Sequence, residues 1–275
     1  MLPQVELFGC TVQSYYLCAA LAGIVGTSLA IFTLRREGFG IWQYLLPVIV
    51  AAMALIGARL FNYLLDPKAY GESFPVWTIS YRKLSLMGGL IAGVLTVLAF
   101  CAAARKSPFR LMDAFVLPAG SGIILLKLGC FLNGCCCGKS TDGLLGMVFP
   151  ANTALFDYLD TLPLLAGQNR AVYPTQLFEL FGAALGLAVI LPLCQRKTFP
   201  GGVKAVLYAM WFTLVRLAVH PLRAFPYEKR VVTAAYPVFY CTILLALGIT
   251  LILLIKKSKE EKSDVLYQMR KSDCR

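Results

Sequence analysis

The chain has 275 residues, of which 59% are hydrophobic and 15% charged, and its formal net charge is +12. Its mean hydropathy is +0.71. Soluble domains carry about 25% charged residues, so this composition excludes a water-soluble domain, and its hydrophobicity excludes a disordered chain. The basic residues separate long apolar runs and do not gather on one face. The positive charge therefore indicates orientation in a membrane, and we expect no nucleic-acid partner.

Seven apolar stretches follow one another, each with about the twenty residues that a helix needs to cross ~30 Å of hydrocarbon. They lie at 13–34, 41–65, 84–103, 109–132, 173–194, 201–221 and 232–255. A transmembrane β-barrel is excluded because its segments are about ten residues long. The sequence therefore predicts an all-α integral membrane protein with seven transmembrane helices. We expect one membrane domain over residues 1–256, which includes a long loop region at 133–172, and a basic tail over 257–275.

The distribution of Lys and Arg predicts the orientation of these helices. With the N-terminus outside, fifteen basic residues lie on the cytoplasmic side and eight on the outer side. Three more, Arg59, Lys127 and Arg216, lie within apolar runs. Basic residues are enriched in cytoplasmic loops, so we expect the N-terminus and the 133–172 loop outside and the C-terminus in the cytoplasm.

Polar side chains within the apolar runs gather in the outer third of the expected bilayer. They are Arg59, Asn62, Lys127, Asn133, Gln176, Glu179, Arg216, His220 and Arg223. Such residues usually face the interior of a helix bundle and mark a functional site. The alternative for Arg223 is that its side chain snorkels to the head groups. Arg216, His220 and Arg223 stand at i, i+4 and i+7 on one helical face, although Pro221 distorts the helix there.

Several cations and one carboxylate in one layer favour an anionic ligand. A phospholipid head group is the anion most available at this depth, and Arg binds phosphate in a bidentate manner. Glycines lie in the same layer, at Gly88, Gly89, Gly129, Gly134 and Gly138. They allow either a substrate or a neighbouring helix to approach the backbone closely.

Four of the ten cysteines lie between Cys130 and Cys137, at the expected outer mouth of the bundle. Their spacing lacks the separated pairs of structural zinc sites, and the only histidine, His220, is distant along the chain, so the sequence predicts no metal site. Three alternatives stay open. The cysteines could form a disulfide, supply a nucleophile beside Lys139 or His220, or pack around a glycine-rich turn.

Six segments together resemble the prolipoprotein diacylglyceryl transferase family of bacteria. They are Ser14-Tyr15-Tyr16-Leu17, Gly57-Ala58-Arg59-Leu60, SLMGGLIAG at 85–93, LLKLGCFLNGCCCGKST at 125–141, YPTQLFEL at 173–180, and Arg216-x3-His220-x2-Arg223. They are similar, in the same order, to the family's SYGL, GxRLxY, HGGL, GR-x-GNF-x-NGE-x-xG, HP-[TS]-QLYE and RF-x2-EFxR. The resemblance spans about residues 8 to 225.

This resemblance implies an enzyme of lipoprotein biosynthesis in the bacterial plasma (inner) membrane. The family moves a diacylglyceryl group from phosphatidylglycerol, or a related anionic phospholipid, to a cysteine thiol of a preprolipoprotein, and it releases glycerol phosphate. No cofactor is implied. By position, Arg216 and Lys127 would hold the phosphate, with Lys127 in place of a family arginine. The residues that would line the lipid site are Tyr15, Arg59, Met87, Gly88, Gly89, Asn133, Gly138, Gln176, Glu179 and Arg223.

The chain departs from the family pattern at several positions. Met87 stands where the family has a histidine, and His220 stands where it has a glutamate. Cys130, Cys135 and Tyr173 replace an asparagine, an acidic residue and a histidine of the signatures. His220 is then the one imidazole that could act as a base, so we assign His220, Arg216 and Lys127 as the candidate catalytic residues.

Two other functions stay open. Loss of the histidine at Met87 favours a catalytically inactive, lipid-binding paralogue. The cysteine run favours a membrane thiol or redox protein that uses Cys135 to Cys137. A transporter is disfavoured because no polar residues line an inward-facing path.

Overall fold

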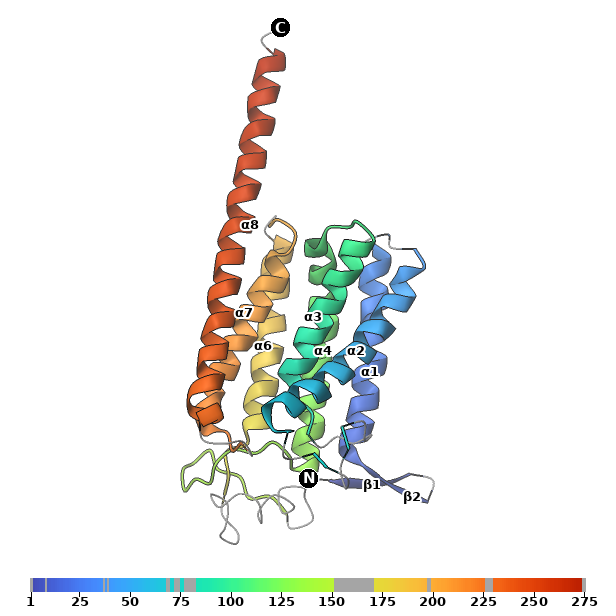
Figure 1. The fold of residues 1–275 in the computed structure, drawn as a ribbon, viewed down its shortest axis with the longest axis vertical. Coiled ribbons are helices and arrows are strands. Elements are labelled where there is room, and N and C mark those ends of the chain that lie inside the picture. The colour runs from blue at the N-terminus through green and yellow to red at the C-terminus, as the bar shows by residue number, and fades with distance from the viewer. Residues whose placement is uncertain are drawn as a thin grey trace.

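The computed structural model describes residues 2–273 except 8, 37, 39, 68–69, 72–74, 77–82, 151–170, 197–198 and 226–229. Within the described residues, seven helices are long and apolar enough to cross a membrane, which confirms the predicted number of spans. They are α1 (Ser14–Arg36), α2 (Trp42–Leu65), α3 (Leu86–Ala103), α4 (Pro108–Asn133), α6 (Thr175–Arg196), α7 (Val203–Val219) and α8 (Tyr236–Asp273). Helix α8 continues to Asp273 and leaves the bundle (Figure 1), and the boundary between the membrane domain and the basic tail at residue 256 stays a prediction.

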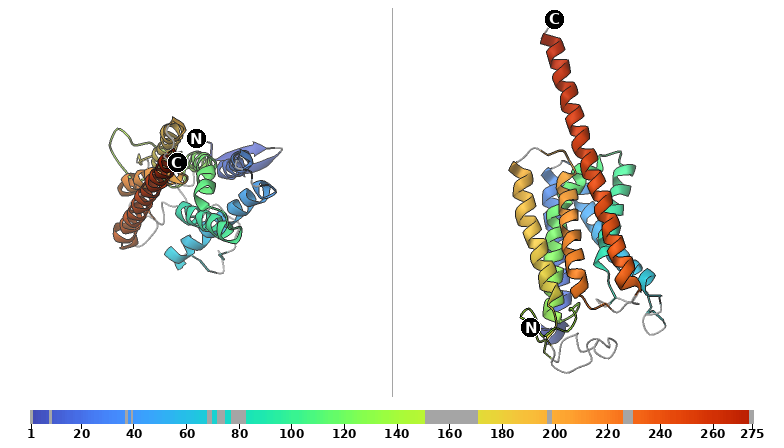
Figure 2. Two further views of the ribbon diagram at one scale, coloured as in Figure 1. Left: turned by 90° about the horizontal axis from the view of Figure 1, so that it is seen from above. Right: turned by 90° about the vertical axis from the view of Figure 1, so that its left-hand side faces the viewer.

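Helix α4 occupies the centre of the bundle. It packs against α1 on one side and against α6 and α7 on the other, while α2 pairs with α3 and α7 with α8. Figure 2 shows this arrangement from above and from the side. Two prolines, Pro47 in α2 and Pro118 in α4, lie inside helices. Near its end, α4 meets the start of α6, where the ammonium group of Lys127 pairs with Glu179.

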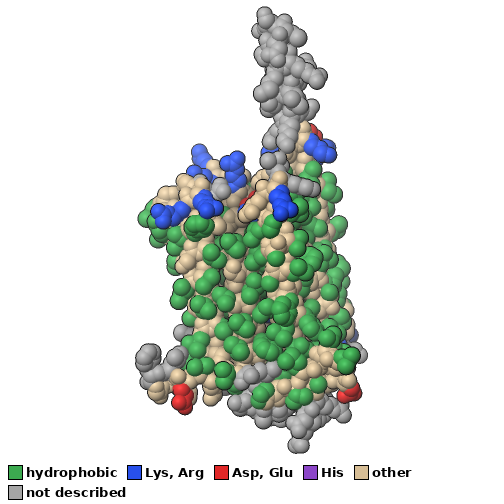
Figure 3. Space-filling model, turned by 180° about the vertical axis from the view of Figure 1, so that it is seen from behind, with side chains coloured by type: hydrophobic (Ala, Val, Ile, Leu, Met, Phe, Trp, Pro, Cys, Tyr) green, Lys and Arg blue, Asp and Glu red, His purple; other side chains and the backbone are tan. Residues whose placement is uncertain are grey.

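The two ends of the bundle differ in charge. Hydrophobic side chains cover the sides, and Lys and Arg side chains gather at the end where α8 leaves the bundle (Figure 3). Arg35 and Arg36 end α1 at that side, and Arg196 ends α6 there. This is the end that the sequence predicts to be cytoplasmic, and the orientation itself stays a prediction.

The opposite end carries the N-terminus and a short β-hairpin, which was not expected from the sequence. Strand β1 (Gln4–Leu7) pairs antiparallel with β2 (Cys10–Gln13), so that Gln4 faces Gln13. Gly9 has φ +80°, a value suited to glycine at a tight turn. The amide of Ser14 donates to the carbonyl of Pro3 at 3.0 Å, which joins the hairpin to the start of α1.

Candidate functional site

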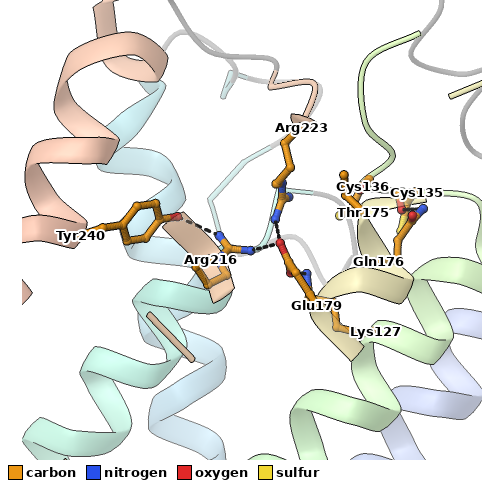
Figure 4. Close-up of polar contacts among 9 residues, drawn as sticks. All are labelled: Lys127, Cys135, Cys136, Thr175, Gln176, Glu179, Arg216, Arg223 and Tyr240. Carbon is orange, nitrogen blue, oxygen red and sulfur yellow. Dashed lines mark hydrogen bonds and ion pairs between the residues drawn. The ribbon is translucent and has the colours of Figure 1, made fainter. Parts of the chain in front are cut away.

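A single carboxylate, Glu179, lies at the centre of the polar residues that the sequence singled out. It stands one turn into α6 and is fully buried, at 0% exposure. Nη1 of Arg216 and Nη1 of Arg223 each donate to its Oε1 at 2.7 Å (Figure 4). The ammonium group of Lys127 pairs with its Oε2. Three cations from α4, α7 and the segment after α7 therefore surround one anion, and positive charge is in excess.

The expected stripe of Arg216, His220 and Arg223 on one helical face is not what the structure has. Helix α7 ends at Val219, and a 3-10 turn, η3 (His220–Leu222), contains Pro221. Arg223 follows with φ −78° and ψ 143°, which is extended backbone. Because proline ends the α-helix, His220 and the two arginines have different partners, although both arginines still contact Glu179.

His220 contacts aromatic side chains and the backbone of the segment that leads into α8. The centroid of its ring lies 5.0 Å from the ring centroid of Phe225 and 5.7 Å from that of Tyr236. Its Nε2 is 2.7 Å from the carbonyl oxygen of Val232. A carbonyl can only accept, so Nε2 carries the proton in the neutral ring and Nδ1 holds a lone pair. Among the described residues, Nδ1 has no hydrogen-bond partner.

Tyr240 of α8 belongs to the site, although it is not among the residues predicted from the sequence. Its hydroxyl accepts a hydrogen bond from Nη2 of Arg216 at 3.2 Å, and the side chain is buried. A signal was present in the sequence, since Tyr236 and Tyr240 stand at i and i+4 near the outer end of the last apolar run. Glu179 and Tyr240 together hold both terminal nitrogens of the Arg216 guanidinium.

Several buried donors of the site have no partner within the part of the chain that the structure describes. They are Nε of Arg216, Nε of Arg223 and Nδ2 of Asn133. A buried donor without a partner costs about 1–3 kcal/mol, and more when the group is charged. An anionic oxygen near the two arginines would satisfy their Nε–H groups and offset the excess positive charge. The arrangement is therefore suited to an anionic ligand.

A turn after α4 is joined by backbone hydrogen bonds to the residues just before α6 and to the 3-10 turn after α7. Gly138 donates to the carbonyl of Tyr173 at 2.8 Å, and Lys139 donates to that of Leu222 at 2.8 Å. A Cβ at Gly138 would lie 2.6 Å from the carbonyl oxygen of Leu222, so only glycine fits without a shift. The predicted site residue Gly138 therefore holds the start of α6 and the end of α7 together.

The first turn of α6 holds the same segment by its side chains. Gln176, buried, donates to the carbonyl of Cys135 at 2.7 Å and to Sγ of Cys137 at 3.1 Å. Thr175, which the sequence reading did not single out, donates to the carbonyl of Cys136 at 2.9 Å. Gln176 and Thr175 therefore hold the cysteine run against the first turn of α6, the helix that also carries Glu179 (Figure 4).

The cysteines of this turn fall into two groups. The sulfur atoms of Cys130, Cys135 and Cys136 all lie within 4.8 Å of one another, and Tyr15 packs against the first two. Hydrogen bonds from Cys130 and Cys135, with the charges of Lys127 and Arg223, hold the pKa of the Cys136 thiol well below its usual value.

Cys137 has a different environment. Its thiol donates to the carbonyl of Gly134 at 3.3 Å, and burial raises its pKa to about 12. All four of these cysteines are free, and of the four only Cys136 is exposed.

Arg59 and Asn62 of α2 lie buried near the chain that connects α2 to α3. Nη1 of Arg59 donates to the carbonyl of Lys83 at 3.4 Å. The hydroxyl of Tyr70 is 2.7 Å from Oδ1 of Asn62 and 3.2 Å from the same carbonyl of Lys83. These contacts organise the connection between the two helices, and a lipid contact of Arg59 stays a prediction.

Gly88 and Gly89 lie where α2 and α3 pack closely. A Cβ at Gly88 would overlap Cβ of Phe61 and the carbonyl oxygen of Gly57, and one at Gly89 would lie 3.1 Å from the carbonyl oxygen of Ala54. The contacts that the structure describes are those of helix packing. A lipid contact of the two glycines stays a prediction.

Met87 precedes this pair and is buried in an apolar cluster with Tyr236 and Tyr240. It therefore packs against the same tyrosine that contacts Arg216.

Comparison with known proteins agrees with the resemblance in the motifs. The model of the family described as prolipoprotein diacylglyceryl transferase matches residues 4–254. Phosphatidylglycerol–prolipoprotein diacylglyceryl transferases are among the similar proteins. That of Prochlorococcus marinus is 26% identical over 234 residues, covering 77% of this chain and 75% of its own. Those of Lactobacillus acidophilus (26% over 223 residues, 79% and 77%) and Clostridium tetani (24% over 222 residues, 80% and 84%) are similar to the same degree.

Proposed function

Because the chain belongs to the prolipoprotein diacylglyceryl transferase family, we propose that it moves a diacylglyceryl group from phosphatidylglycerol to a cysteine thiol of a preprolipoprotein. The observation that carries the proposal is the cluster around Glu179. There, three cations share one carboxylate, and two guanidinium Nε–H groups have no partner among the described residues. The lipid phosphate is the ligand that these groups suit.

Glu179 acts in this proposal as a positioning residue for the phosphate-binding cations. It fixes Nη1 of both arginines, and Tyr240 fixes Nη2 of Arg216. The guanidinium groups are therefore oriented before the lipid binds, and their charge acts in a low-dielectric environment, where it is strongest. Lys127 adds a third positive charge next to the same carboxylate.

The reaction itself is a displacement at the glyceryl carbon that carries the phosphate. The acceptor thiolate forms a carbon–sulfur bond, and the carbon–oxygen bond to the phosphate breaks. The electron pair leaves on the glycerol phosphate oxygen. Arg216 and Arg223 stabilise the negative charge that develops there, and this stabilisation favours the transition state over the bound lipid.

His220 supplies the base in this scheme. Its Nε2–H donates to the carbonyl of Val232, which leaves the Nδ1 lone pair to accept the thiol proton. Met87, buried among apolar side chains, cannot take this role. Transfer in phosphatidylglycerol vesicles with a lipobox peptide tests the scheme. We expect His220→Gln to lower the transfer rate about 100-fold or more while binding of the lipid stays within twofold.

Arg196→Ala serves as the matched control, because Arg196 is exposed at the other end of α6. Its transfer rate should equal that of the unchanged protein. Normal turnover in His220→Gln would contradict the role of His220. If the unchanged protein bound phosphatidylglycerol but formed no product with any lipobox peptide, the lipid-binding paralogue, which the buried Met87 favours, would replace the transferase proposal.

The proposal also includes an orientation in the bacterial plasma (inner) membrane, with the site toward the outer leaflet. A membrane-impermeant thiol reagent on intact cells tests it. Cys10 is exposed on β2 and should react, whereas Cys274, near the C-terminus and outside the described residues, should react only after lysis. The reverse pattern would place the Glu179 cluster at the inner leaflet and contradict the proposed lipid source.

A further inference from the structure

Three thiols that the sequence separates are brought together at the end of α4. Gly134 ends the helix with φ +72°, and the amide of Cys135 then donates back to the carbonyl of Cys130 at 3.0 Å. Cys136 follows with φ +61°, a conformation that few non-glycine residues adopt. This reversal places the sulfur atoms of Cys130, Cys135 and Cys136 within 4.8 Å of one another.

We propose that these three cysteines bind a zinc ion whose fourth coordination position takes the acceptor thiol. Zinc binds thiolates at about 2.3 Å in a tetrahedral arrangement, which places neighbouring sulfur atoms about 3.8 Å apart. The observed separations, all within 4.8 Å, need only a small adjustment to reach that geometry. Binding of the acceptor thiol at the fourth position rests on the proposed transferase function, whereas binding of zinc by the three cysteines does not.

The three cysteines differ in burial. Cys130 and Cys135 are buried and pack against Tyr15, whereas Cys136 is exposed. Three protein ligands with one accessible position are typical of zinc sites at which a water or a substrate completes the shell. Cys137 is held away by its hydrogen bonds with Gly134 and Gln176, so it is the member of the run that we exclude as a ligand.

The charge around the cluster suits such a site. A zinc ion with three thiolates has an excess of one negative charge, and a fourth thiolate adds another. Lys127 stands three residues before Cys130 on α4, hence on the same side of the helix. Arg223 and Lys127 both act electrostatically on Cys136. These two cations can offset the charge of the thiolates.

The site would explain how the acceptor is activated without the family histidine at Met87. A thiol that binds zinc loses its proton, because the ion stabilises the thiolate. The proton passes to Nδ1 of His220, and the bound sulfur then attacks the glyceryl carbon as the carbon–oxygen bond to the phosphate breaks. Zinc keeps its oxidation state throughout. The sequence alone argued against a metal, because the chain spacing does not show that Cys130 meets Cys135 and Cys136.

Cobalt substitution tests the metal site without any turnover. The full-length reduced protein in detergent, loaded with Co²⁺, should show a sulfur-to-cobalt charge-transfer band at one ion per chain. Cys136→Ser, at an exposed position, and Cys130→Ser should each lose most of this band. Cys137→Ser, from the same run, and Cys241→Ser, exposed on α8, should keep it. No band in the unchanged protein, equal bands in all variants, or a disulfide within the three cysteines as isolated would overturn the metal site.

A lipobox peptide then tests the fourth position on the same cobalt protein. A fourth thiolate should raise the charge-transfer intensity by about a third over that of three. The peptide with serine in place of its cysteine should leave the spectrum unchanged. If cobalt binds through the three cysteines and the thiol peptide has no effect, the acceptor role is overturned. Failure of transfer in the vesicle assay would instead count against the proposed function, because the spectrum needs no reaction.

Discussion

The Glu179 cluster and the contact between α2 and α3 both contain motifs that resemble those of the family, but their residues have different roles. Around Glu179, charged side chains from three separate segments converge on one carboxylate. At the α2–α3 contact, Gly88 brings two backbones together against Gly57 and Phe61. The first region holds charge where a ligand can use it, and the second sets the distance between helices. In the described residues, the polar motif gathers charge, whereas the glycine motif is in contact with a neighbouring helix.

Of the substitutions that probe these two regions, replacement of Glu179 should lower the free energy of unfolding most. Glu179→Gln leaves three buried cations without a counter-charge, and we expect it to lower the free energy of unfolding by about 3–5 kcal/mol. Thermal unfolding in detergent measures this. Glu260→Gln is the control, because the pair of Lys256 and Glu260 is 3.9 Å apart and exposed by 72% and 63%. Equal, small effects of both substitutions would show that Glu179 does not balance the cations.

The two arginines should differ in how much they contribute to lipid binding. The Arg216 side chain is 6% exposed and held by two partners, whereas that of Arg223 is 12% exposed. Arg216→Ala should cost about 1.5–3 kcal/mol of phosphatidylglycerol binding, roughly ten- to hundredfold, and Arg223→Ala less. Native mass spectrometry would measure the binding of phosphatidylglycerol to each variant, with phosphatidylcholine as the comparison lipid. Equal and mild losses would mean that these cations contact head groups only at the surface.

A substitution at the α2–α3 contact should lower stability without removing the proposed lipid site around Glu179. In Gly88→Ala the new Cβ would overlap Phe61 and Gly57, so the helices must separate, at a cost of about 1–3 kcal/mol. Gly93→Ala on the same helix is the control, since its Cβ would meet Val50 at an ordinary 3.6 Å. Thermal unfolding compares the two. If Gly88→Ala unfolded normally but lost lipid binding, the glycine would belong to the lipid site, as its motif suggests.

The smallest change in unfolding free energy is expected for removal of the Tyr240 hydroxyl, which accepts a hydrogen bond from Arg216. Tyr240→Phe removes one hydrogen bond of 3.2 Å while keeping the buried ring, so we expect a loss of about 0.5–1.5 kcal/mol in unfolding free energy. Tyr44→Phe, at an exposed position of α2, should change nothing. A Tyr240→Phe protein as stable as the unchanged one would show that Glu179 alone orients Arg216.

Much of the site was visible in the sequence because buried charge is rare in membrane spans. Lys127, Glu179 and Arg216 stood out as ionisable residues in apolar runs, and the structure brings all three together. Tyr240 did not stand out, because a tyrosine near a membrane boundary is common and its partner cannot be read from spacing. His220 keeps its helical relation to Arg216, because its amide donates to the carbonyl of Arg216, whereas Arg223 leaves the i, i+4, i+7 pattern, because Pro221 ends the helix before it.

The sequence by itself determined the seven spans and predicted a polar layer within them. Both depend on local quantities, namely the length of an apolar run and the cost of a charge within it. Tertiary structure alone decided which residues meet. The rotation of each helix sets the convergence of Lys127, Arg216 and Arg223 on Glu179. The left-handed turn at Gly134 sets the meeting of Cys130 with Cys136, because reversal of the chain after α4 is a property of backbone geometry that residue spacing does not encode.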